Sequence, residues 1–192
     1  DPDADRTGVT IKSAKGEYIT LTGNQIGALL VDYIIKGHKE AGTLKDNACA
    51  IRSVVSSPLF DAICTSQGVK PMCVLTGFKY IGEKIKEFLA SGDYTFIFGY
   101  EESFGFLSGA YARDKDAVGA TMLIAEMASF YKEKGLTLWD VLQNLYKEHG
   151  FYEEKTVSVA IGGIDPMAKM REIMSNLRSN PPKEVCSIPA VS

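Results

Sequence analysis

Apolar and polar positions follow two different periods along this chain, and each change of period marks the edge of an expected element. Where apolar residues recur at helical spacing, as after Thr22 and after Tyr80, the pattern predicts an amphipathic helix. Short runs of apolar, aromatic and β-branched residues, as at 94–98, are typical of strands buried on both faces. We expect strands at 8–12, 17–21, 48–55, 69–75, 94–98 and 155–161, and helices at 22–42, 58–66, 80–89, 117–134, 136–149 and 165–177.

Local signals support several of these boundaries. Lys15-Gly16 predicts a hairpin turn between the first two strands, and Thr22 with Gln25 forms a capping-box pattern at a helix start. Pro58 suits the first turn of a helix, where its missing N–H leaves no hydrogen bond unmade. Strands and helices then alternate with connections of the length that crossovers need. We therefore expect an α/β fold, a three-layer α/β/α domain with a mixed, largely parallel sheet.

The stretch 94–105 carries polar side chains directly after an apolar run. Gly99 is expected to end the strand, and Glu101, Glu102 and Ser103 follow at once. In an open α/β sheet, ligands bind just beyond the carboxyl ends of the strands. A carboxylate and a hydroxyl two residues apart can accept and donate hydrogen bonds to a polyol such as a sugar. The alternative is a solvated turn with two surface glutamates, and spacing alone does not decide between the two.

The chain opens with acids at alternate positions, Asp1, Asp3 and Asp5. In an extended loop such side chains point the same way, and three carboxylates that converge on one hard cation suit Mg²⁺. Arg6 adds a planar guanidinium that matches the geometry of phosphate. An EF-hand loop is excluded, because it needs Gly and Glu where this sequence has Arg6 and Lys12. The alternative is that the acids are only solvated.

Two further positions lie where a strand ends or a helix begins. Thr76 follows the expected strand 69–75 directly, so it should share the sheet edge with Glu101. Lys115 lies in the polar loop 108–116, just before a helix whose N-terminus favours a nearby anion. Lys115 can face a phosphate there, although a lone lysine before a helix is more often just solvated.

Composition narrows the class of protein. A formal net charge of -3 over 192 residues is too small to indicate nucleic acid or an anionic membrane as a partner, and no apolar run reaches membrane-spanning length. The four cysteines show no Cys-x-x-Cys spacing, which is typical of a reduced, cytoplasmic protein. Both histidines lie late in expected helices, so Ser-His-Asp or Cys-His catalysis is poorly supported.

Four of these stretches together resemble the α-D-phosphohexomutases, the family of phosphoglucomutase and phosphomannomutase. Asp1-Pro-Asp-Ala-Asp-Arg6 resembles the family's Asp-x-Asp-x-Asp-Arg magnesium loop, and Thr76-Gly-Phe-Lys79 resembles the Thr-Gly loop of its third domain. Gly99-Tyr-Glu-Glu-Ser-Phe-Gly105 resembles the sugar-binding loop, usually Gly-Glu-x-Ser, with Tyr100 as an extra residue after the first glycine. Arg113-Asp-Lys-Asp116 matches a basic segment downstream, and all four follow the family's order.

The resemblance implies an activity and a role for each matched residue. The parent enzyme would move a phosphoryl group between C1 and C6 of a hexose phosphate, of glucose or mannose, through a phosphoserine and a hexose bisphosphate. The implied ligands of a Mg²⁺ cofactor are Asp1, Asp3 and Asp5. The implied substrate-binding residues are Arg6, Thr76, Glu101, Ser103 and Lys115, with Glu102 as the less direct acid.

The same resemblance predicts a segment of a longer enzyme. Residues 1–14 would be the end of domain 2 with the metal-binding loop, 15–163 the sugar-binding domain 3, and 164–192 a helix and linker towards domain 4. The family's phosphoserine lies in a Thr-Ala-Ser-His-Asn-Pro type loop that nothing here matches. We therefore expect no catalytic residue in this segment and no turnover by it alone. The implied partners are hexose phosphate, hexose bisphosphate and the missing domains of the same chain.

Two alternatives stay open, and a third is disfavoured by the sequence. A phosphopentomutase of the same family would share these loops. A non-catalytic sugar-phosphate-binding or structural α/β module would need no nucleophile. A Mg²⁺-dependent phosphatase with an aspartyl nucleophile would need an apolar strand before its acid, and nothing apolar precedes Asp1.

Overall fold

The structure, a computed structural model, describes residues 2–13, 15–154, 160–163, 165–185 and 188–189. The chain divides into two compact units, Asp1–Glu153 and Glu154–Ser192. The second unit contains helix α6 (Pro166–Ser179) and the short strands β7 (Glu184–Val185) and β8 (Ile188–Pro189). The predicted helix at 165–177 corresponds to α6, which Asp165 caps by accepting the N–H of Ala168 at 2.9 Å.

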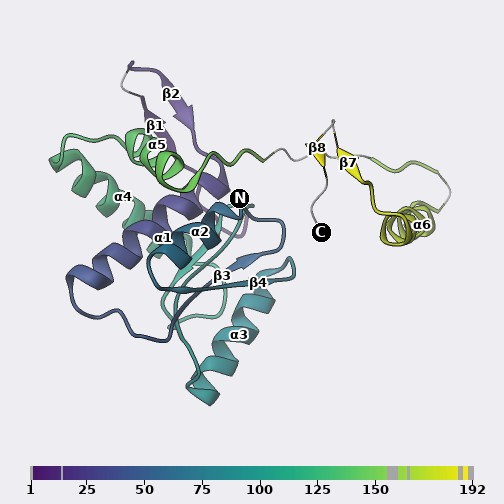
Figure 1. The fold of residues 1–192 in the computed structure, drawn as a ribbon, viewed down its shortest axis with the longest axis horizontal. Coiled ribbons are helices and arrows are strands. Elements are labelled where there is room, and N and C mark those ends of the chain that lie inside the picture. The colour runs from purple at the N-terminus through teal and green to yellow at the C-terminus, as the bar shows by residue number, and fades with distance from the viewer. Residues whose placement is uncertain (1, 14, 155–159, 164, 186–187, 190–192) are drawn as a thin grey trace. The chain divides into compact units, whose positions relative to one another are not determined.

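A four-stranded sheet forms the middle layer of the first unit (Figure 1), and hydrogen bonding gives it the strand order β4-β3-β5-β6. β3 (Ala48–Ser53) is parallel to both its neighbours, β4 (Lys70–Val74) and β5 (Thr95–Glu101), whereas β6 (Gly105–Ser108) is antiparallel to β5. Every residue of β3 is buried, as expected of a central strand that is covered on both faces. The prediction of a mixed, largely parallel sheet is confirmed.

Helices cover both faces of this sheet. α3 (Phe78–Ser91) packs on β3 and β5 at one face, while α1 (Gly23–Glu40) contacts β5 and α2 (Leu59–Ser66) contacts β4 at the other (Figure 1). α4 (Ala117–Glu133) lies against β6, and α5 (Leu138–His149) packs on α1, α2 and α4. The predicted three-layer α/β/α architecture is confirmed.

Side chains of the central strand enter two separate cores in alternation. Ala48 and Ala50 face the larger core, which includes α1, α2, α4 and α5, whereas Cys49 and Ile51 face a smaller core under α3. Ala50 is paired with Phe98 of β5, so a small residue lies beside a large ring. Burial raises the pKa of the Cys49 thiol to about 12, and this cysteine is an apolar core side chain.

β5 is longer than the sequence pattern predicts. Gly99, which we expected to end the strand, lies inside β5, and the chain returns after Glu101 as β6, a strand that the pattern does not predict. A Cβ at Gly99 would lie 3.0 Å from Ile81 and 3.1 Å from Phe96. The expectation was wrong because this glycine allows α3 to pack closely on the sheet, rather than ending the strand.

A register shift in β5 determines which face its last residues occupy. The pairing with β3 passes from Cys49 and Phe96 to Ala50 and Phe98, so Ile97 is an extra residue. Ile97 and Phe98 consequently both enter the larger core. Beyond this bulge the side chains alternate again and Tyr100 faces the larger core.

The segments before and after the sheet agree with the expected pattern where they are described. β1 (Thr10–Lys12) and β2 (Tyr18–Thr20) form the predicted antiparallel hairpin. Thr22 Oγ1 accepts the N–H of Gln25 at 3.2 Å and Gln25 Oε1 accepts the N–H of Thr22 at 2.9 Å, which is the predicted capping box. The strand expected at 155–161 falls mainly outside the described residues. In the described ranges, no helix is long and apolar enough to cross a membrane.

Candidate functional site

Two neighbouring acids, Glu101 at the end of β5 and Glu102 directly after it, connect this end of the strand to two different loops. Glu101 is 6% exposed, and its Oε1 accepts the backbone N–H of Gly77 at 2.6 Å, just before α3. Glu102 is half-buried, and its Oε2 lies 3.1 Å from Ser53 Oγ and 3.4 Å from Ser56 Oγ. The turn after β5 is thus tied to the loops that follow both β4 and β3.

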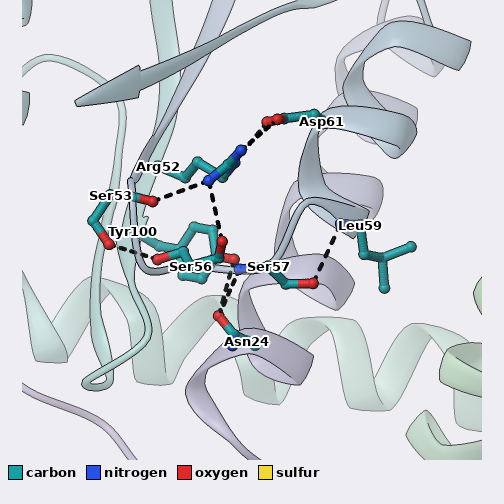
Figure 2. A network of polar contacts seen from close by, with 8 residues as sticks. All are labelled: Asn24, Arg52, Ser53, Ser56, Ser57, Leu59, Asp61 and Tyr100. Atoms are coloured by element: carbon teal, nitrogen blue, oxygen red, sulfur yellow. Dashed lines mark hydrogen bonds and ion pairs between the residues drawn. The ribbon is translucent and has the colours of Figure 1, made fainter. Parts of the chain in front are cut away.

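A buried guanidinium organises the turn between β3 and α2, residues 53–58 (Figure 2). Arg52 donates from Nε and Nη2 to the two oxygens of Asp61 on α2, at 2.8 and 2.6 Å. Its Nη1 donates to the carbonyls of Ser53 and Ser56 at 3.2 and 3.1 Å. The hydrogen bond with Asp61 raises the pKa of Arg52, so the guanidinium stays charged although it is only 9% exposed.

Asn24, in the first turn of helix α1, also holds the β3–α2 turn in place. Asn24 Oδ1 accepts the N–H of Ser57 at 3.1 Å and the hydroxyl of Tyr100 at 3.2 Å (Figure 2). Ser57 Oγ in turn accepts the N–H of Leu59 at 3.2 Å, at the start of α2. One amide side chain therefore joins α1, β5 and the β3–α2 turn.

Lys115 brings together all four stretches that the sequence singled out. Its Nζ lies 3.2 Å from Asp5 Oδ2, 2.9 Å from Asp114 Oδ1 and 5.4 Å from the centre of the Phe78 ring. Its aliphatic stem passes over Gly105 so closely that a Cβ there would lie 2.4 Å from Lys115 Cδ. The acidic loop, the loop after β4, the turn after β5 and the segment before α4 therefore meet at this side chain.

The charge of Lys115 is stabilised by its carboxylate neighbours. Burial lowers the pKa of the ammonium group, but hydrogen bonds to Asp114 and Asp5 outweigh this effect and raise that pKa above its ordinary value. Burial likewise raises the pKa of the Asp114 carboxyl, and the hydrogen bonds from Lys115 outweigh it and lower that pKa. At neutral pH the site therefore holds a fixed cation between two carboxylates.

The loop before β1 is held against the β5–β6 turn through its backbone. The N–H of Thr7 donates to the carbonyl of Phe104 at 3.1 Å, and Thr7 Oγ1 donates to the carbonyl of Ala117 at 3.1 Å. An open groove of about 630 Å³ lies between this loop and α4. The residues that line it are Ala4, Arg6, Thr7, Ala117, Val118, Thr121 and Met122.

The other predicted substrate-binding residues differ in their exposure. Thr76, Ser103 and Arg6 are exposed, so their polar groups can reach a ligand in solution. Glu101 is buried, and one of its two oxygens already accepts from Gly77. A sugar hydroxyl at this edge would therefore donate its hydrogen bond to the second oxygen of Glu101.

Two of the three expected Mg²⁺ ligands are described, while Asp1 lies outside the described residues. Asp3 is exposed, and Asp5 is half-buried beside Lys115. Within the described ranges, no group of three acidic, histidine or cysteine side chains is arranged to hold a metal ion. Carboxylate oxygens are the donors that Mg²⁺ prefers, so the residues fit the ion in kind, and the Mg²⁺ site stays a prediction.

Sequence reasoning missed the network around Arg52, which includes Ser53, Ser56 and Asn24. One signal was present in the sequence, because Arg52 is the one charged residue in the expected strand 48–55. A charge in such a run has to be paired when the strand is buried. The identity of its partner, Asp61, follows only from the packing of α2 beside β3.

The fold and the site together define a class of protein: an α/β domain that gathers acidic, hydroxyl and basic side chains at the carboxyl edge of its sheet, where such folds bind ligands. Residues 22–149 match the family model described as phosphoglucomutase/phosphomannomutase, alpha/beta/alpha domain III. The chain belongs to the phosphoglucomutase/phosphomannomutase family, as the motifs predicted.

Individual relatives agree with this assignment. Phosphoglucomutase of Staphylococcus aureus (strain N315) is 40% identical over 185 residues, which cover 96% of this chain and 32% of that protein. The open form of pp63/parafusin, a phosphoglucomutase from Paramecium, shares the fold with a TM-score of 0.64 at 21% identity, over 93% of this chain and 28% of that one. The chain therefore spans about a third of the length of the curated relatives that it matches.

A further protein with this fold has been solved with ligands. Aspergillus fumigatus N-acetylphosphoglucosamine mutase, in complex with GlcNAc-6P and magnesium, shares the fold with a TM-score of 0.54 at 17% identity, over 74% of this chain and 34% of that one. A second structure of that mutase, in complex with glucose 1,6-bisphosphate, has a TM-score of 0.51 at 18% identity, over 77% and 31% of the two chains.

Proposed function

We propose that this chain is the sugar-binding segment of a phosphohexomutase, which moves a phosphoryl group between C1 and C6 of glucose or mannose phosphate through a phosphoserine and a bisphosphate. The observation that carries the proposal is the meeting of four separate stretches at Lys115, in a chain of this family. Membership of the family supports an isomerase of carbohydrate metabolism, and the identity to S. aureus phosphoglucomutase supports a hexose substrate.

In this proposal the carboxyl edge of the sheet binds the sugar hydroxyls. Ser103 can donate and accept a hydrogen bond, and the second oxygen of Glu101 can accept one. The hydroxyl of Thr76 adds a further contact beside Gly77. Selectivity follows because a largely buried acid such as Glu101 disfavours any ligand that leaves its oxygen without a hydrogen bond.

Cationic groups beside this edge would hold the phosphate. Lys115 lies next to Gly105, and Arg6 lines the open groove between the first loop and α4. Asp1, Asp3 and Asp5 would hold Mg²⁺, as the resemblance implies. When bound, Mg²⁺ supplies positive charge that stabilises a transferring phosphoryl group. The relative with bound GlcNAc-6P and magnesium supports this assignment by analogy.

We further infer that the activity belongs to a longer cytoplasmic protein. Residues 1–14 would close the preceding domain, 15–163 would form the sugar-binding domain, and 164–192 would lead to a following one. Hexose phosphate, hexose bisphosphate and the other domains of the same chain are then its partners. This inference is supported because the chain covers only about a third of the length of its curated relatives.

Steady-state kinetics of the complete protein that contains this chain test the proposal. With Mg²⁺ and glucose 1,6-bisphosphate present, glucose 1-phosphate should be converted to glucose 6-phosphate. Mannose and ribose 1-phosphates, assayed in parallel, report the preference among sugars. Ser103→Ala should lower kcat/KM about tenfold, because a lost hydrogen bond to substrate costs on the order of 1–2 kcal/mol.

Matched controls make the result specific to the site. Lys115→Ala should lower kcat/KM, whereas Lys84→Ala, which removes an α3 lysine paired with Glu87, should leave it unchanged. The 192-residue chain alone should show no turnover in the same assay. Turnover by the chain alone, or kinetics of Ser103→Ala equal to those of the unaltered protein, would contradict the proposal.

A further inference from the structure

Ser53 and Ser56, in the turn after β3, are held from two opposite sides. Their backbone carbonyls accept hydrogen bonds from Arg52 Nη1, at 3.2 and 3.1 Å. Their hydroxyls lie within hydrogen-bond distance of Glu102 Oε2, at 3.1 and 3.4 Å. Ser53 is 0% exposed and Ser56 is 3% exposed, so water does not compete for these contacts.

The contacts that Glu102 makes with the two serine hydroxyls differ in length. The two hydroxyls lie 2.7 Å apart, so three close contacts share only two hydroxyl protons. Either serine hydroxyl can donate to the other, and Ser53 Oγ lies closer to Glu102 Oε2 than Ser56 Oγ does. Ser53 therefore makes the closer of the two hydroxyl contacts that attach Glu102 to the turn.

The Glu102 carboxylate accepts hydrogen bonds from hydroxyl groups, those of Ser53 and Ser56. Arg52 Nε and Nη2 pair with the two oxygens of Asp61, and Nη1 donates to the carbonyls of Ser53 and Ser56. Glu102 is consequently held through acceptor geometry, so an amide of the same shape can replace its carboxylate.

The backbone of Glu102 is fixed as well as its side chain. A Cβ at Gly23 would lie 2.0 Å from the carbonyl oxygen of Glu102, so the first turn of α1 packs directly on this residue. With Ser53 on one side and Gly23 on the other, Glu102 has little freedom to move. Its neighbours Glu101 and Ser103 share that restraint because they are joined to it covalently.

We propose that Glu102 is a positioning residue. It acts through Ser53 to hold Glu101 and Ser103 in the position in which they can form hydrogen bonds with a sugar. This inference rests on the proposed function, since it assumes that these two neighbours bind the substrate. Glu102 itself makes no contact with substrate in this account. Its carboxylate faces the β3–α2 turn, whereas Glu101 on the adjacent position faces the loop before α3.

The test compares variants of the complete protein by steady-state kinetics with glucose 1-phosphate. Glu102→Ala should lower kcat/KM about tenfold, mainly through a higher KM, and Glu102→Gln should stay within about threefold because the amide oxygen still accepts from Ser53. Ser53→Ala should resemble Glu102→Ala, and the double variant should be no worse than either single one. Glu87→Ala, on α3, is the control that should change nothing.

A second measurement separates this inference from the proposed function. Amide hydrogen exchange in 53–58 and 101–105 should speed up together in Glu102→Ala and in Ser53→Ala, while Glu102→Gln keeps both segments protected. Glu102→Ala kinetics within twofold of the unaltered protein, additive effects in the double variant, or a Gln variant as impaired as the Ala variant would overturn the inference. An unaltered protein without mutase activity would instead refute the proposed function, and exchange coupled as described would still support the Glu102–Ser53 link.

Discussion

At the scale of single residues, Asp116 shows how one carboxylate fixes the start of a helix beside the site. Its Oδ1 accepts the N–H groups of Val118 at 3.0 Å and of Gly119 at 3.1 Å, and its Oδ2 accepts the hydroxyl of Tyr111. The hydrogen bonds from Tyr111 and from the backbone lower the pKa of Asp116. Because Asp116 directly follows Lys115, this cap fixes the position from which Lys115 extends.

Asp116→Ala should therefore destabilise the protein in a pH-dependent way. The lowered pKa of Asp116 means that its stabilisation is fully present at neutral pH and is lost as pH falls below about 4. We expect a loss of about 1 kcal/mol at pH 7, typical of a helix N-cap, which shrinks towards pH 3. Urea unfolding at several pH values measures it. Asp116→Asn, which caps as well, should remain close to the unaltered protein at pH 7, and an Ala effect equal at both pH values would contradict this explanation.

At the scale of elements, the first turn of α1 is the contact that joins the helical layer to the β5–β6 turn. A Cβ at Gly23 would meet backbone atoms, with the carbonyl carbon of Glu102 at 2.7 Å and the N of Phe104 at 3.1 Å. Phe104 has a positive φ of 70°, so the turn is already in a restricted conformation. The backbone there cannot move aside at low cost.

Two glycines of α1 should accordingly respond to alanine in opposite directions. Gly23→Ala should lower the free energy of unfolding by about 1–3 kcal/mol, because the new methyl group clashes with backbone. Gly37→Ala should raise it by about 0.5–1 kcal/mol, because nothing lies within 4 Å and alanine favours a helix. Denaturant unfolding of both variants checks this, and a tolerated Gly23→Ala would show that the close packing is wrong.

Most elements could be predicted from the sequence, because their periods and caps are local properties. The helix that begins at Thr22 and the central strand 48–55 lie close to their observed bounds. The failures have a common cause, since Gly99 and the strand β6 depend on what packs against them. The same holds for the site, where motifs singled out Glu101 and Lys115, but the buried support from Arg52 depends on tertiary contacts.

At the scale of the whole molecule, a site emerges from stretches that are distant in sequence. Asp5 and Lys115 are separated by more than half of the chain, yet their side chains form an ion pair at 3.2 Å. The N–H of Thr7 donates to the carbonyl of Phe104 and the N–H of Asp116 donates to the carbonyl of Phe106, so both segments lie beside the β5–β6 turn. The first unit therefore already contains the groups that we assign to sugar and phosphate.

The most direct test of this account is a crystal structure of the complete protein with glucose 1,6-bisphosphate bound. We predict sugar hydroxyls within hydrogen-bond distance of Glu101 and Ser103, a phosphate near Lys115 or Arg6, and Glu102 still bonded to Ser53 without touching the ligand. A sugar bound away from the turn after β5, with Glu101 and Ser103 both beyond hydrogen-bond distance, would contradict the central claim.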